Sequence, residues 1–212
     1  MTFIRTLLTI CTIVAISYCD RNKITHSRPE TFFLQDSLFR IDVNVPIELD
    51  SFYTWVDFDH DDTVCEVLQM YRFSNSKYPI YRKVGFSYPT YPDSSYHLTF
   101  SHIYMYDCQD SEGRVKLKEL IRREEERAKS RGFDFKLFSS ESVNINGQAF
   151  DIIKFRTNLL PKQKYHSTLI WGFTRVDNIY LKVEYECASK NCDSFIERMS
   201  ESLESIRVTK KN

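Results

Sequence analysis

The strongest constraint on the fold is a hairpin signal in the second half of the chain. The segment SVNINGQAFDIIKFRT holds Asn146 and Gly147 between two strand-like arms. Both residues tolerate the positive φ angles that a two-residue hairpin turn requires, so the pair predicts an antiparallel β-hairpin. The segment HSTLIWGFTRVDNIYLKVEYE repeats the plan, with Asp177 and Asn178 at the turn. The second half of the chain therefore predicts an antiparallel meander.

The first half adds further strand signals. In LFRIDVNVP, apolar Phe39, Ile41 and Val43 alternate with polar residues, and Pro46 ends the run. Such alternation is typical of a strand with one buried face. The segments TVCEVLQMYRF, RKVGFSY and SYHLTFSHIYMY predict three more strands.

Two amphipathic helices complete the pattern. Apolar residues from Leu117 to Ala128 recur at helical spacing, and Gly132 is placed to end that helix with a positive φ. A second helix closes the chain, and its Ser194 and Glu197 have the spacing of a capping box. This order predicts an α+β domain, in which an antiparallel sheet is covered by two amphipathic helices.

The N-terminus carries an export signal. Arg5 precedes a run from Thr6 to Ile16 that, after Thr6 itself, is apolar apart from Thr9 and Thr12. About a dozen such residues suit the hydrophobic region of a signal peptide and are too few to span a bilayer comfortably. We expect residues 1–19 to be a signal peptide, residues 20–36 a polar tether, and residues 37–209 a single α+β domain. The alternative for the leader is a buried N-terminal helix.

Cys19 ends the leader and determines the localisation. The sequence Ile16-Ser17-Tyr18-Cys19 is similar to a bacterial lipobox, although Tyr18 replaces the small residue that usually precedes the cysteine. We expect Cys19 to be acylated, which would hold the exported protein on a membrane of the bacterial cell envelope. Cleavage after Ser17 would instead give a secreted or periplasmic protein, and an uncleaved leader would remain as an anchor.

Four cysteines remain beyond the leader and Cys19: Cys65, Cys108, Cys187 and Cys192. An oxidising compartment permits disulfides, and four cysteines allow three connectivities. The short spacer in CASKNC favours a bridge between Cys187 and Cys192, and Cys65 would then pair with Cys108. Four free, buried thiols are the alternative. The cysteine and histidine spacings do not match a zinc site.

Composition limits the classes of partner. The chain has 212 residues, and its 29 Lys and Arg balance its 29 Asp and Glu, so no net charge attracts it to nucleic acid. Aromatic residues form 15% of the chain against only 5 Gly and 6 Pro, which favours a folded, β-rich domain.

A tyrosine–proline segment is the best candidate for a partner-binding surface. In YPIYRKVGFSYPTYPDSSY, prolines are interleaved with Tyr78, Tyr81, Tyr88 and Tyr91. Tyrosine offers a large contact area at small entropic cost and is enriched at interfaces. We expect these four residues to contact an envelope protein. The alternative is that their rings cover the sheet or stiffen a loop.

The acidic segment DFDHDD is the nearest approach to a metal motif. Asp57, Asp59 and Asp61 follow the first spacings of a calcium loop, but Asp62 stands where glycine is required and Leu68 where glutamate is required. We therefore expect an exposed acidic loop, no metal site and no cofactor.

The sequence names no catalytic residue. It has no nucleophile-elbow motif and no phosphate-binding loop, and His97 and His102 fall on opposite faces of one predicted strand. We expect a protein that binds and does not catalyse. The alternative is an exported hydrolase whose Ser/His/Asp site is assembled in space.

Two resemblances extend this interpretation. The chain resembles the PsbP-like α/β/α sandwich over roughly Leu38 to Val208. Two segments carry this resemblance: LKELIRREEERAKSRGFDFKLFSSESVNINGQAFDIIKF and IYLKVEYECASKNCDSFIERMSESLESIRV. The chain is also similar to the gliding-motility lipoprotein D family in three segments: RPETFFLQDSLFRIDV, VGFSYPTYPDSSYHLTFSH and FIERMSESLESI. The second resemblance implies a non-enzymatic lipoprotein that is an accessory of a gliding or secretion machine in the envelope.

Overall fold

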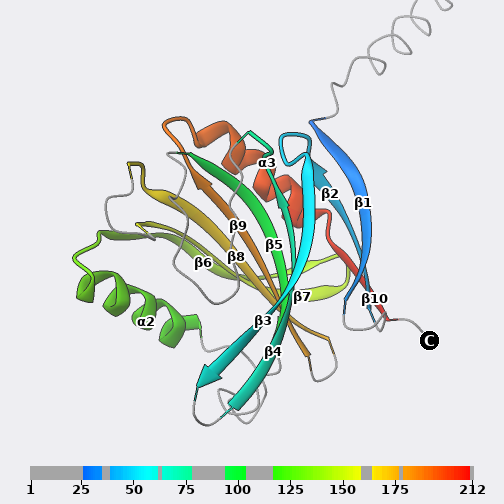
Figure 1. The fold of residues 1–212 in the computed structure, drawn as a ribbon, viewed down its shortest axis with the longest axis horizontal. Coiled ribbons are helices and arrows are strands. Elements are labelled where there is room, and N and C mark those ends of the chain that lie inside the picture. The colour runs from blue at the N-terminus through cyan, green and yellow to red at the C-terminus, as the bar shows by residue number, and fades with distance from the viewer. Residues whose placement is uncertain are drawn as a thin grey trace, which may run out of the picture.

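A seven-stranded antiparallel sheet forms the centre of the domain (Figure 1). The computed structural model describes residues 26–34, 39–61, 64–77, 94–103, 117–158, 164–176 and 179–210. The strand order is β3-β4-β5-β9-β8-β7-β6, and every neighbouring pair is antiparallel. The strands are β3 (Ser51–Asp61), β4 (Val64–Ser74), β5 (Ser95–Ile103), β6 (Phe135–Ile145), β7 (Gln148–Thr157), β8 (Ser167–Val176) and β9 (Ile179–Ala188).

A second sheet of three strands packs beside the first. Its order is β1 (Ser27–Leu34), β2 (Phe39–Pro46) and β10 (Arg207–Lys210), again antiparallel. The tether predicted over residues 20–36 is therefore wrong at Ser27–Leu34, because this segment pairs along its whole length with β2. Its alternating Phe32 and Leu34 are buried and give the strand a core face that the polar composition concealed.

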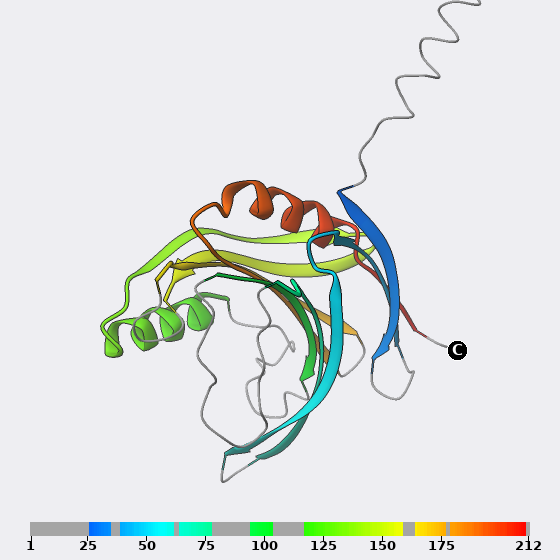
Figure 2. The ribbon, with the colours of Figure 1, turned by 45° about the horizontal axis from the view of Figure 1, so that its top comes forward.

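The two helices lie on opposite faces of the large sheet. Helix α3 (Asp193–Glu204) contacts β2, β8 and β9, whereas α2 (Leu117–Ser130) contacts β6 and β7. Figure 2 shows the large sheet curved like an arch, with α3 and the small sheet outside it and α2 at its open end. The α+β class is thus confirmed, as an antiparallel sheet covered by two amphipathic helices.

The core is divided by the large sheet into two parts. The main cluster joins α3 and the small sheet to the convex face and includes the fully buried Phe100, Tyr185 and Met199. A smaller cluster around Phe155 and Trp171 is covered by the apolar side of α2. The concave face of β5 and β9 carries polar side chains instead, and the candidate site lies there.

The predicted hairpin turn is confirmed. Asn146 and Gly147 have φ angles of 51° and 87°, and they connect β6 to β7. The Asn146 amide also donates to the carbonyl oxygens of Glu204 and Ile206, at 3.1 and 2.9 Å. The turn therefore also fastens the C-terminal end of α3. Gly132 follows α2 with a φ of 70°, as predicted.

Two local predictions are wrong. The capping box is absent, because α3 begins two residues earlier than predicted, with Cys192 at its N-cap and no side-chain cap. The disulfide from Cys192 to Cys187 fixes the chain at that point. The predicted acidic loop is a strand from Asp57 to Asp61, because this segment pairs with β4 as far as Val64. The predicted strand RKVGFSY lies outside the described residues.

Candidate functional site

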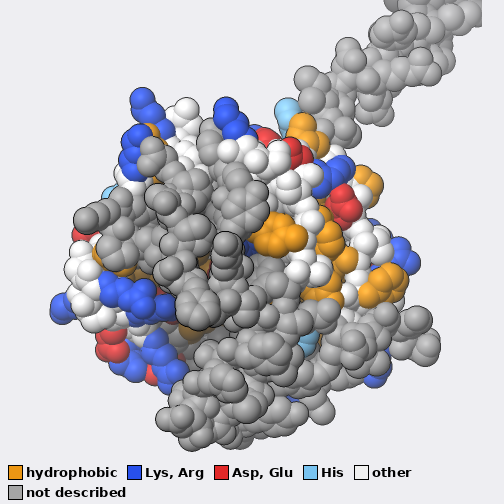
Figure 3. Space-filling view, viewed as in Figure 1, with side chains coloured by type: hydrophobic (Ala, Val, Ile, Leu, Met, Phe, Trp, Pro, Cys, Tyr) orange, Lys and Arg blue, Asp and Glu red, His pale blue; other side chains and the backbone are white. Residues whose placement is uncertain are grey.

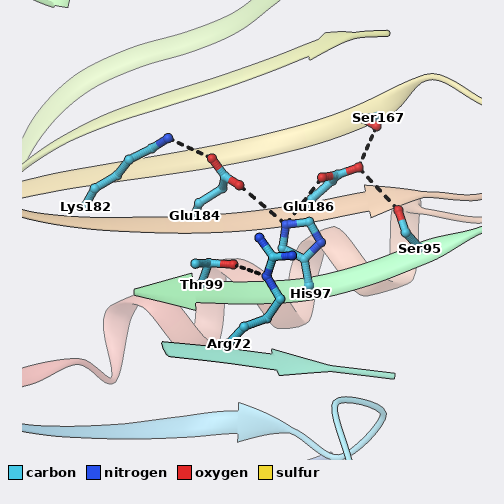
Figure 4. Close-up of polar contacts among 8 residues, drawn as sticks. All are labelled: Arg72, Ser95, His97, Thr99, Ser167, Lys182, Glu184 and Glu186. Carbon is cyan, nitrogen blue, oxygen red and sulfur yellow. Dashed lines mark hydrogen bonds and ion pairs between the residues drawn. The ribbon is translucent and has the colours of Figure 1, made fainter. Parts of the chain in front are cut away.

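A histidine and two glutamates meet on the concave face of the large sheet (Figure 4). Strand β9 alternates its side chains, so Lys182, Glu184 and Glu186 share one face. Strand β5 pairs with β9 so that His97 stands opposite Glu186. The antiparallel register therefore brings together residues that are almost ninety positions apart in the sequence.

The ring of His97 faces both carboxylates through one nitrogen. Its Nε2 lies 3.4 Å from Oε1 of Glu184 and 3.3 Å from Oε2 of Glu186. The side chains of His97 and Glu186 are 2% and 1% exposed, and that of Glu184 is 20% exposed. We call His97, Glu184 and Glu186 the His–Glu–Glu cluster.

The outer oxygens of both carboxylates are held by separate donors. Lys182 Nζ lies 2.7 Å from Oε2 of Glu184. The hydroxyls of Ser167 and Ser95 donate to Oε1 of Glu186, at 2.8 and 3.3 Å. These contacts leave Oε1 of Glu184 and Oε2 of Glu186 directed at the ring nitrogen.

Two cationic side chains flank the cluster. Lys182 also lies over the ring of Trp171, with Nζ 3.9 Å from the ring centroid. Arg72 reaches the same region from β4, and its Nε donates to Oγ1 of Thr99 at 2.8 Å (Figure 4). Lys182 pairs directly with Glu184 and offsets the charge of that carboxylate.

Glu184 is held in its ionised form. Desolvation raises the pKa of its carboxyl, but the charge of Lys182 and the hydrogen bond with His97 outweigh this, and the pKa falls well below its ordinary value. Glu184 therefore presents carboxylate oxygens, not a carboxylic acid, at neutral pH.

The cluster does not have the hydrogen-bond order of a hydrolase triad. In such a triad, the serine donates to the histidine and the histidine to the acid. Here the hydroxyls of Ser95 and Ser167 donate to Glu186 within the described part of the chain. His102 lies on the opposite face of β5, because it pairs with buried Leu181, and His166 is exposed just before β8.

The residues predicted from the sequence meet different outcomes. Cys187 and Cys192 form a disulfide that joins the end of β9 to α3, as predicted. Cys65 lies on β4, where only the backbone is described, and Cys108 lies outside the described residues. Also outside are Cys19 and the four predicted partner-binding residues, Tyr78, Tyr81, Tyr88 and Tyr91.

Sequence reasoning missed the His–Glu–Glu cluster. The segment LKVEYE places three charged residues at every second position of a strand that was predicted to lie inside a meander. A charged face on a central strand is unusual unless its charges are paired or bind something. The alternating charges of β9 can therefore be read from the sequence, but their partner His97 is identified only by the β5–β9 register.

A second polar surface lies on β6, the edge strand of the large sheet, and on its neighbour β7. We call Lys136, Phe138, Lys154 and Arg156 the basic edge. Phe138 is 43% exposed, with Lys136 Nζ 5.3 Å and Arg156 Cζ 5.9 Å from its ring centroid. Lys136 pairs with Arg156 across β6 and β7, and a β-bulge between Leu137 and Ser139 interrupts the register.

Other exposed apolar side chains lie elsewhere. Figure 3 shows hydrophobic side chains on the side of the molecule where β1, β2 and β3 lie. Among the exposed large hydrophobic residues are Phe33 of β1, Phe52 of β3 and Ile47, which directly follows β2.

Comparison with known proteins supports the fold and no particular family. No family model and no curated protein matches the chain. The solution structure of cyanobacterial PsbP (CyanoP) from Synechocystis sp. PCC 6803 is similar, with a TM-score of 0.52 and 10% identity, over 87% of this chain and 94% of that one. PA94 of Pseudomonas aeruginosa, a protein of unknown function, aligns over 87% of this chain and 99% of that one, with a TM-score of 0.43 and 14% identity.

The first resemblance drawn from the sequence is therefore supported at the level of the fold, which is PsbP-like. The resemblance to the gliding-motility lipoprotein D family is not supported, because no family model matches. In the described part of the chain, no helix has the length and apolar character needed to cross a membrane.

Proposed function

We propose that this chain is an exported, non-enzymatic accessory module that binds an acidic segment of another envelope protein. The PsbP-like fold is compatible with this role and names no partner. The proposal is based on the basic edge, where an exposed aromatic ring lies near two cations that form no ion pair within the described part of the chain.

The cations of the basic edge lack carboxylate partners among the described residues. Arg28, Arg40, Arg122 and Arg198 all form ion pairs within the domain. No ion pair is formed by Lys136, Lys154 or Arg156 within the described ranges. Their charges are therefore available to a partner, and complementary charges favour recognition and fast association.

The form of the edge favours contact through side chains. A β-bulge disrupts the regular ladder and disfavours the addition of a foreign strand. Phe138 can be covered by an apolar residue of the partner, while Lys136 and Arg156 meet its acidic residues. Aromatic and arginine side chains are frequent among the residues that dominate binding energy.

The tyrosine–proline segment is the second proposed contact. The strands on either side of it, β4 and β5, pair at one end of the sheet, where Ser74 lies opposite His97. We propose that Tyr78, Tyr81, Tyr88 and Tyr91 extend the partner surface. Acylation of Cys19 would keep the module on the envelope membrane, and intact mass of the membrane fraction tests that part separately.

The experiment is site-specific photocrosslinking from position 138 in intact cells, followed by identification of the crosslinked peptide. We expect a peptide rich in Asp and Glu. The double variant Lys136→Glu with Arg156→Glu should reduce crosslinking by about tenfold or more, as expected for a hot spot.

Lys129→Glu with Arg131→Glu is the matched control, since both residues are exposed near the end of α2 and the charge change is identical. Crosslinking that is equal in both double variants would refute the proposed surface. A crosslinked peptide without acidic residues would refute the proposed partner chemistry.

A further inference from the structure

We propose that the His–Glu–Glu cluster binds a divalent transition-metal ion, with Zn²⁺ as the preferred probe. The ligand atoms would be His97 Nε2, Glu184 Oε1 and Glu186 Oε2. The proposal rests on the geometry of these residues and is independent of the proposed partner surface.

The distances in the cluster suit ligands around a common centre. Two ligands at about 2.1 Å from zinc, separated by a tetrahedral angle, lie about 3.4 Å apart. The distances from His97 Nε2 to the two carboxylate oxygens are 3.4 and 3.3 Å. All three ligand atoms lie within 4.8 Å of one another.

A hydrogen-bond pair explains these contacts less well. A neutral imidazole has one N–H, and Nε2 would have to share a single hydrogen between two oxygens at nearly equal, long distances. The other nitrogen, Nδ1, is buried and has no hydrogen-bond partner in the described part of the chain. A ring that is 2% exposed thus gains two long contacts through one atom and none through the other.

The surrounding donors resemble the outer shell of a metal site. Carboxylate ligands are usually oriented by hydrogen bonds to their free oxygens. Lys182 does this for Glu184, and Ser95 and Ser167 do it for Glu186.

The ligand set selects the class of metal. Imidazole suits Zn²⁺ and neighbouring transition ions, whereas Ca²⁺ and Mg²⁺ prefer oxygen alone. Three protein ligands leave a fourth position for water or another small ligand. A hydroxide or another anion at that position would lower the charge that the ion adds.

Lys182 distinguishes a metal site from an ion-pair network. In a metal site, Lys182 opposes the ion by charge and contributes no ligand atom. Lys182→Gln should therefore keep zinc affinity or increase it. In a closed ion-pair network, zinc would not bind, and this substitution would only remove a partner of Glu184.

The test is titration of the full oxidised chain with Zn²⁺ by calorimetry, together with the absorption spectrum of Co²⁺ as a substitute. We expect one ion per chain and a Co²⁺ spectrum without thiolate charge-transfer bands, which separates this site from the cysteines. His97→Gln and Glu186→Gln should each weaken zinc binding by more than about tenfold, since even outer-shell changes cost about 10–100-fold.

His166→Gln with Glu197→Gln is the matched control, because both residues are exposed outside the cluster. Thermal unfolding keeps the test valid if a cluster variant is unstable: zinc should raise the Tm of wild type and Lys182→Gln but not of Glu186→Gln. Absence of saturable binding, retention of binding in both cluster variants, or loss of binding in Lys182→Gln would overturn the proposal.

Discussion

The phenol of Tyr185 donates a hydrogen bond to Oγ of Ser202 at 2.8 Å, and Ser202 Oγ in turn donates to the backbone oxygen of Asn44 at 2.6 Å. This relay joins β9, α3 and β2. Tyr185 and Ser202 are 0% and 2% exposed. Three layers of the domain therefore depend on one buried hydroxyl of a helix that is otherwise apolar on this side.

Removing that hydroxyl should be costly. Ser202→Ala leaves the phenol of Tyr185 and the oxygen of Asn44 without this partner, and an unsatisfied buried polar group costs about 1–3 kcal/mol. Tyr185→Phe should cost less, about 1 kcal/mol, because Ser202 still bonds to Asn44. Urea unfolding measures both changes.

Ser200→Ala is the matched control within the same helix. Its hydroxyl donates to the carbonyl oxygen of Ile196, one turn earlier, at 3.2 Å. We expect a change in unfolding free energy smaller than that of either relay variant. A Ser200→Ala variant as unstable as Ser202→Ala would contradict the special role of the relay.

Tyr185 should also make the protein sensitive to alkali. Burial raises the pKa of its phenol, and the hydrogen bond with Ser202 lowers it only in part. Between the unfolded pKa of about 10 and the higher folded pKa, the unfolded chain has lost a proton that the folded chain keeps. Unfolding free energy should therefore fall as pH rises above about 10.

The comparison with Tyr185→Phe isolates this effect from the other tyrosines and the lysines. Urea unfolding at several alkaline pH values should give a steeper loss of stability for wild type than for the variant. Parallel curves for the two proteins would show that Tyr185 does not keep its proton in the folded state.

Gly172 on β8 is required by the closeness of α3. An added Cβ would lie 3.2 Å from Cδ1 of Leu203 and 3.5 Å from the ring of Phe150. Gly172→Ala should destabilise the domain by about 1–3 kcal/mol, the usual cost of overpacking. Denaturant unfolding of the single variant measures this loss.

Leu203→Ala supplies a double-mutant test of the same contact. Alone it should cost about 2–5 kcal/mol, because Leu203 is buried. In the double variant, the new methyl group at position 172 meets free space, so the two costs should sum to more than the measured total by at least about 0.5 kcal/mol. Strict additivity would show that the methyl clash lies elsewhere.

Local sequence patterns were sufficient to predict most of the fold. The Asn146-Gly147 turn, the apolar stripes of both helices and the alternation of Phe39 to Val45 each encode their own structure, because backbone preference and burial agree there. Strands β1 and β10 were missed because they are stabilised by pairing with β2, and neither has a strong pattern of its own.

The candidate site could not be predicted from the sequence for a different reason. The charged positions of β9 were visible in LKVEYE, but the approach of His97 depends on the pairing register of β5 with β9, which no local pattern states. The basic edge is similar: Lys136 and Arg156 become neighbours only through the β6–β7 register. By contrast, the bridge between Cys187 and Cys192 needs only a short spacer and was predicted.

That bridge should contribute a modest stabilisation. Its cysteines are separated by 5 positions, so it closes a short loop of the unfolded chain. The chain-entropy relation gives about 2 kcal/mol for a loop of this size. We expect reduction to lower the unfolding free energy by about this amount, and to loosen the start of α3, whose N-cap is Cys192 and has no other side-chain cap.

The measurement is urea unfolding of the wild type with and without a thiol reductant, compared with the double variant Cys187→Ala and Cys192→Ala. The double variant should show no dependence on reductant if this bridge accounts for the whole effect. A remaining dependence would reveal a second disulfide, and peptide mapping would show whether it joins Cys65 to Cys108. Equal stability of oxidised and reduced wild type would contradict the prediction, because the bridged loop would then be as ordered in the reduced unfolded chain as in the oxidised one.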